Sequence, residues 1–144
     1  MLICTSEDRA PDLIGVKLLV SSLARHLPMV PVHVACPTPG AELETWLRHR
    51  PNVTLDMTRD ESLAGWNAKA GLLLRLLDAG HREVIWIDAD VIVAGDFRSL
   101  VPSDTSLIVT EELSRNGPKP IVRLATSSQP IWLRTRDATH QGRN

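Results

Sequence analysis

Hydrophobic residues near the N-terminus occur first as a run, then at helical spacing, then in alternation with polar residues. Leu2–Cys4 is a short apolar run and predicts a first strand. Apolar residues three and four positions apart then predict a helix that ends before Pro28. The residues with this spacing are Leu13, Val16, Leu19, Val20, Leu23 and Leu27.

Shorter elements follow this helix. Val32 and Val34 alternate with His33, which predicts a second strand. Thr38 and Pro39 have the residue types of an N-cap and a first helical position, so we expect a short helix to begin there and to end before Pro51. The range Val53–Asp56 then predicts a third strand.

The segment from Ser62 to Gly80 has the strongest helical pattern in the chain. Ser62 is a suitable N-cap, and Gly80 stands just past the expected end. Its apolar residues fill one arc of about 200° around the helix, and these are Trp66, Ala70, Leu72, Leu73, Leu74, Leu76 and Leu77. Lys69 falls inside this arc. A lysine there must extend its ammonium group to solvent or meet an anion.

The next apolar segment, Val84–Ile87, has no polar alternation. Such a run predicts a parallel strand that is buried on both faces, and 107–110 could form a further strand. Strands and helices therefore alternate along the chain. This order predicts an α/β fold with a Rossmann-like, mostly parallel sheet and helices on both faces.

Charge divides the chain into two parts. Residues 1–114 carry ten Lys or Arg and sixteen Asp or Glu, whereas residues 115–144 carry six and one. Periodicity is lost in the second part. We therefore expect an α/β domain over 1–114 and a basic, disordered tail over 115–144.

Composition also limits the partners and the compartment. A formal net charge of -1 argues against nucleic acid as a partner, because duplex binding requires a dense positive surface. Apolar stretches are too short for a membrane span, and the N-terminus lacks the pattern of a secretory signal peptide. Cys4 and Cys36 have no metal-site or disulfide-framework spacing. We therefore expect a cytoplasmic protein.

The chemistry is expected at Asp88 and Asp90, which follow the predicted strand over 84–87. Open α/β sheets bind ligands at the carboxyl ends of their strands. Two carboxylates this close repel each other unless a cation lies between them, and oxygen ligands suit Mg²⁺ or Mn²⁺. Such an ion completes its shell with water and phosphate oxygens, which indicates a diphosphate ligand. The alternative is that Asp88 and Asp90 only cap a turn.

Two motifs together resemble the nucleotide-diphospho-sugar glycosyltransferases of the GT-A fold. They are the helix that begins W-N-A-K at Trp66, and the D-x-D between the apolar runs 84–87 and 91–93. The resemblance covers residues 1–112 and implies a UDP- or GDP-sugar as donor and Mn²⁺ or Mg²⁺ as cofactor. It implies that Asp90 binds the metal and that Asp88 binds the metal or the ribose. Trp66 and Lys69 would lie at the donor, with Lys69 facing its diphosphate or sugar. Thr5, Ser6 and Glu7 would lie beside the nucleotide.

The chain is shorter than members of that family generally are, and the missing part normally contacts the acceptor. The sequence therefore resembles a C-terminally truncated, metal-dependent glycosyltransferase whose activity is weak or lost. A non-catalytic nucleotide-binding remnant is the first alternative. A phosphatase of the haloacid-dehalogenase type is the second, although that family places its D-x-D near the N-terminus.

Overall fold

The computed structural model describes residues 1–9, 14–59, 68–101, 105–109 and 123–126. The chain divides into two compact units, Met1–Asp96 and Phe97–Asn144. The domain boundary expected from charge and periodicity, after residue 114, stays a prediction. Each unit is described below by itself.

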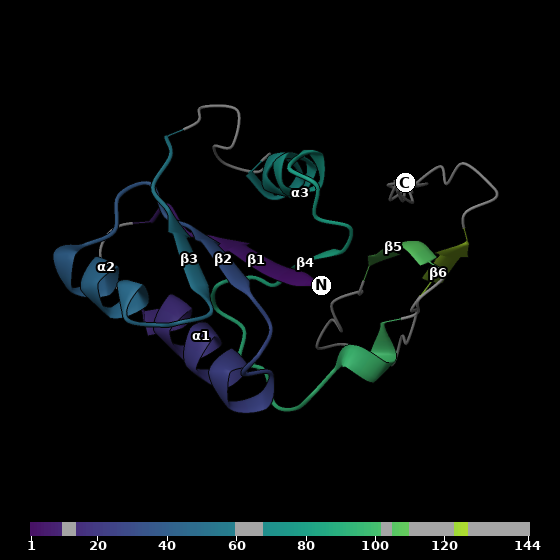
Figure 1. Ribbon diagram of the computed structural model, residues 1–144, viewed down its shortest axis with the longest axis horizontal. Coiled ribbons are helices and arrows are strands. Elements are labelled where there is room, and N and C mark those ends of the chain that lie inside the picture. Colours follow the sequence, from purple (N-terminus) through teal and green to yellow (C-terminus); the bar gives the residue numbers. More distant parts are fainter. Residues whose placement is uncertain (10–13, 60–67, 102–104, 110–122, 127–144) are drawn as a thin grey trace, which may run out of the picture. The chain divides into compact units, whose positions relative to one another are not determined.

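The first unit is built on a sheet of four parallel strands. These are β1 (Leu2–Ser6), β2 (Val32–Ala35), β3 (Val53–Asp56) and β4 (Val84–Trp86), in the order β3-β2-β1-β4 (Figure 1). In the central strand, Ile3 is in register with Val32 of β2 and Ile85 of β4. From β1 the chain first builds outward through β2 to β3, and it then returns to add β4 on the other side of β1. The strand order therefore reverses between β1 and β4.

Helices cover both faces of this sheet. Figure 1 shows α1 (Ile14–His26) and α2 (Ala41–Arg48) on one face and α3 (Ala68–Asp78) on the other. The predicted α/β fold class is confirmed, with a parallel sheet between two helical layers. Gly80 has a φ of 95°, and it lies just past the end of α3, as its residue type predicts.

Alternation along the strands sends side chains to both layers. On the α3 side, Leu2 and Cys4 of β1 form a core cluster with Leu72 and Leu76 of α3. On the helical layer opposite, the buried residues are Val16, Leu19, Val20 and Leu23 of α1 and Leu43 and Leu47 of α2. Replacing one of these leucines by alanine would cost about 2–5 kcal/mol of stability.

Three local predictions are corrected. Gly40 is extended, with ψ of 153°, so α2 begins at Ala41 and not after Thr38. The apolar arc of α3 is narrower than predicted, since Leu74 and Leu77 are 61% and 45% exposed; one sheet face covers only part of a helix circumference. β4 is only half-buried, because it pairs with β1 alone among the described strands.

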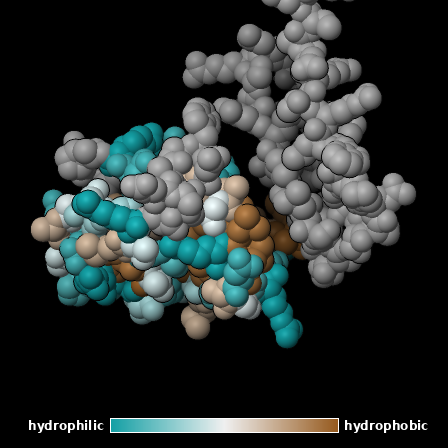
Figure 2. All heavy atoms as spheres, turned by 90° about the horizontal axis from the view of Figure 1, so that it is seen from above, coloured by the Kyte–Doolittle hydropathy of each residue, from teal (hydrophilic) through white to brown (hydrophobic). Residues whose placement is uncertain are grey.

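Exposed apolar side chains give the first unit a mixed surface. Figure 2 shows hydrophilic residues over much of the described surface, with hydrophobic residues among them. Besides the two leucines of α3, Val91 and Ile92 are exposed after the D-x-D motif. No helix in the described ranges is long and apolar enough to cross a membrane.

The second unit contains a short 3-10 helix, η3 (Arg98–Leu100), and an antiparallel pair of strands. These strands are β5 (Thr105–Val109) and β6 (Arg123–Thr126). β5 overlaps the strand predicted over 107–110, of which Thr110 lies outside the described residues. β6 lies within 115–144, where the sequence pattern predicted no strand.

Candidate functional site

The D-x-D motif and the end of β1 meet where the strand order reverses. β1 and β4 are adjacent and parallel, so the segments that follow them leave the sheet at the same edge. The backbone N–H of Ile87 donates to the carbonyl of Cys4 at 3.0 Å, which extends this pairing beyond β4. In open α/β sheets the carboxyl ends of the strands at such a reversal are the usual ligand site.

The motif segment is fixed against helix α1. The backbone N–H of Val93 donates to Ser22 Oγ at 3.0 Å, and that hydroxyl donates to the Leu19 carbonyl at 2.8 Å. At Gly15, an added Cβ would lie 2.8 Å from the carbonyl oxygen of Ala89. Ala89 and Val93 are buried, whereas the intervening aspartate, Asp90, is exposed. Small and apolar residues thus anchor the segment and leave its carboxylates at the surface.

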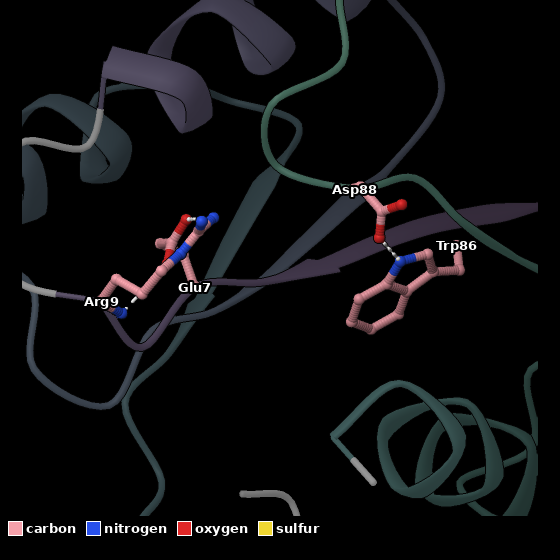
Figure 3. A network of polar contacts seen from close by, with 4 residues as sticks. All are labelled: Glu7, Arg9, Trp86 and Asp88. Carbon is pink, nitrogen blue, oxygen red and sulfur yellow. Dashed lines mark hydrogen bonds and ion pairs between the residues drawn. The ribbon is translucent and has the colours of Figure 1, made fainter. Parts of the chain in front are cut away.

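Asp88 is held by two neighbours through one of its oxygens. Trp86 Nε1 donates to Asp88 Oδ1 at 2.6 Å, and Lys69 Nζ lies 3.1 Å from the same oxygen. The Lys69 ammonium also lies 5.3 Å from the centre of the Trp86 ring. The indole hydrogen bond, and then Lys69, lower the pKa of Asp88 despite partial burial. Figure 3 shows the other oxygen, Oδ2, pointing away from the indole.

Glu7, which follows β1, forms an ion pair with Arg9. Arg9 donates from Nε to Glu7 Oε1 at 2.8 Å and from Nη2 to Oε2 at 2.7 Å, and its backbone N–H donates to Oε1 at 3.0 Å (Figure 3). These bonds from Arg9 outweigh burial and lower the pKa of Glu7. The pair is a bidentate ion pair between a buried carboxylate and an exposed guanidinium.

The remaining predicted site residues have different surroundings. Thr5 is fully buried, and its hydroxyl has no hydrogen-bond partner among the residues described. It therefore lies beneath the surface at which a nucleotide could bind. Ser6 is partly exposed, and its neighbour Glu7 is only 8% exposed. Trp66 lies outside the described residues.

The sequence motifs did not indicate Arg9 or the hydrogen-bonding role of Trp86. The signal for Arg9 was its position two residues after Glu7, which places an opposite charge within reach of the same turn. Trp86 was assigned only to the apolar strand. Its position two residues before Asp88 puts both side chains on the same side of an extended segment, and a half-buried indole N–H needs an acceptor.

The donor set at the D-x-D motif fits a hard divalent cation in part. Asp88 Oδ2 takes part in neither of the contacts that hold Oδ1, and the Asp90 carboxylate is exposed. Within the described ranges, no group of three or more His, Cys, Asp or Glu is placed to hold a metal ion. Mg²⁺ is commonly bound by one or two carboxylates, with water and substrate phosphates as its other ligands. Two carboxylates therefore fit a metal that arrives with a diphosphate.

A second polar cluster lies on the α3 face of β2 and β3. Asp56, the last residue of β3, accepts from Arg75 of α3, and His33 Nε2 of β2 lies 3.3 Å from the same carboxylate. Burial lowers the pKa of His33, although the Asp56 charge opposes this shift. All three groups have partners in the cluster, and we interpret it as a structural contact that joins α3 to the sheet.

Comparison with known proteins identifies no family and no curated relative for this chain. No protein-family model matches the chain, and no curated protein is significantly similar to it. Functional inference therefore depends on the arrangement of Asp88, Asp90, Lys69, Glu7 and Arg9 described above.

Proposed function

We propose that the chain binds a nucleotide-diphospho-sugar together with Mn²⁺ or Mg²⁺, as the donor-binding part of a glycosyltransferase. The observation that carries this proposal is the location of the D-x-D motif, at the carboxyl end of β4 and beside the end of β1. Metal-bound diphosphates suit such a position at the ends of parallel strands, where hard oxygen ligands are available.

Each residue has a distinct role in this proposal. Asp90 and Asp88 Oδ2 hold the metal, which when bound neutralises the diphosphate that leaves the sugar. Lys69 has a dual role, since its ammonium holds Asp88 Oδ1 and remains exposed enough to face the diphosphate. Ser6 is the last residue of β1 and is more exposed than its neighbours Thr5 and Glu7, so it is the residue of these three that would contact the nucleoside.

Donor binding is the part of the function that these residues support. Transfer to an acceptor needs contacts that we do not assign to any described residue. The free, buried thiols of Cys4 and Cys36 are compatible with the proposed cytoplasmic location, because reduced cysteines are usual there.

Calorimetry with UDP and GDP, each with Mn²⁺ and then with EDTA, tests the proposal. We expect either UDP or GDP to bind, and we expect this binding to require the metal. Asp90→Asn should remove more of this binding than Asp88→Asn, because Asp88 is also held by Trp86 and Lys69. Asp78→Asn is the matched control, since Asp78 is exposed at the last residue of α3. Nucleotide binding that the chelator leaves unchanged would exclude the metal role.

A further inference from the structure

The Glu7–Arg9 pair combines a buried acid with an exposed base. Glu7 is 8% exposed, whereas the Arg9 side chain is 73% exposed. A buried carboxylate is costly unless it is paired and hydrogen-bonded. The three bonds from Arg9 meet that need. Glu7 in turn fixes the guanidinium, which on an exposed side chain would otherwise be free to rotate.

The fixed guanidinium has unused donors. Arginine carries five N–H donors in a rigid fork. Glu7 accepts from Nε and from Nη2. With respect to the described residues, Nη1 therefore keeps both of its N–H groups and Nη2 keeps its second one for an exposed acceptor. This geometry suits a phosphate group, which arginine binds through parallel hydrogen bonds.

Arg9 follows β1 and the D-x-D motif follows β4, so both segments leave the sheet at the same edge. The hydrogen bonds of Arg9 to Glu7, and then the negative charges of Glu7 and Asp90, raise the pKa of Arg9. Arg9 and Asp90 come from the ends of β1 and β4, on the two sides of the point where the strand order reverses.

We propose that Arg9 is a phosphate-binding residue of this site and that Glu7 is its positioning residue. This inference rests on the proposed function and adds a contact to it. The ligand class is the diphosphate group of a nucleoside diphosphate, which would accept hydrogen bonds from the outward edge of the guanidinium. Arg9 acts on the phosphates alone, so the nucleoside gains nothing from it.

Titration calorimetry with UDP and with uridine, each with Mn²⁺, tests this inference in Arg9→Gln. We expect UDP affinity to fall by about 10- to 100-fold, the usual effect of losing a charge-assisted hydrogen bond, while uridine binding is unchanged. Arg48→Gln is the matched control. Arg48 also pairs with a glutamate, Glu44, but on the surface of α2, and its loss should leave UDP binding unchanged.

Arg9→Lys is the second variant, for the case that Arg9→Gln leaves the buried Glu7 carboxylate unpaired and the protein fails to fold. A lysine retains the cation beside Glu7 but has no planar fork, so we expect UDP affinity between those of the wild type and Arg9→Gln. UDP affinity within twofold of wild type in both variants overturns the inference, as does an equal loss of UDP and uridine binding.

The wild-type titrations separate this inference from the proposed function. If UDP binds equally with Mn²⁺ and with EDTA but is weakened in Arg9→Gln, the metal-dependent function is wrong and the Arg9 contact stands. If UDP binding requires Mn²⁺ but both Arg9 variants bind normally, the function stands and the Arg9 contact is wrong. If the wild type binds neither UDP nor GDP in either condition, both are wrong.

Discussion

Gly15→Ala probes the contact that positions the D-x-D motif. The added Cβ would lie 2.8 Å from the Ala89 carbonyl oxygen, 0.6 Å short of the 3.4 Å at which ordinary contact begins. The added Cβ is bonded directly to the backbone of α1, and the carbonyl oxygen belongs to the backbone between the two aspartates. Neither can move aside by changing a rotamer. The substitution must therefore shift Ala89 and its neighbours away from α1.

The magnitude follows from two opposing effects. Alanine improves helix propensity over glycine by up to about 1 kcal/mol. Overpacking a close contact costs about 1–3 kcal/mol. We expect a net destabilisation of about 1 kcal/mol, which lowers the melting temperature of a unit of this size by about 4–8 °C. Because Asp90 follows Ala89, metal-dependent UDP affinity should also fall.

Thermal unfolding and calorimetry with UDP and Mn²⁺ measure both effects, and Gly95→Ala is the control. Gly95 lies in the segment that follows the motif, has no atom within 4 Å of an added Cβ, and has no positive φ. The Gly95→Ala protein should unfold at the wild-type melting temperature or slightly above it. A Gly15→Ala protein that is as stable as Gly95→Ala and binds UDP normally would refute the close approach of α1 to the motif.

Three further predictions concern the charges of the first unit. Lys69→Met should keep or raise the melting temperature, because an ion pair as exposed as Lys69–Asp88 contributes little stability; it should weaken UDP binding, and unchanged affinity would limit Lys69 to covering apolar surface. Trp86→Phe keeps the ring but removes the N–H that lowers the pKa of Asp88. Metal-dependent UDP binding should therefore fail at a higher pH than in wild type during acid titration, while Trp46→Phe on α2 should match wild type. Stability to urea should decrease as the pH falls below about 6.5, because burial lowers the pKa of His33 and the unfolded chain binds a proton that the folded chain disfavours. His33→Gln should flatten this decrease, and an unchanged slope would assign it to other groups.

Below that range the acids of the first unit take over the pH dependence. Burial raises the pKa of Asp56, but hydrogen bonds from Thr58 and the charge of Arg75 outweigh it and lower the pKa overall. The contribution of Asp56 is therefore complete above its ordinary pKa of 3.8, and it is lost as the pH falls through the lower, folded-state value. Glu7 and Asp88 follow the same sign.

The hydrophobic pattern by itself determined the elements of the first unit and their fold class. β3 has the bounds that the pattern predicts, α1 covers the helical spacing up to His26, and Gly80 follows the end of α3. These features depend on neighbours within a few residues, through side-chain periodicity and the conformational freedom of glycine. The position of Asp88 and Asp90 after a strand is local in the same way.

Only the tertiary structure decided what surrounds those aspartates. Strand order depends on pairings between distant segments, and the addition of β4 beside β1 places the D-x-D motif at the same edge of the sheet as Glu7 and Arg9. The width of the buried face of α3, which leaves Leu74 exposed, depends on how much sheet lies against it. Lys69 illustrates both levels. Its place within an apolar arc predicted that it would extend to solvent or meet an anion, but the fold alone determined that the anion is Asp88, because the end of β4 brings that carboxylate within reach of α3.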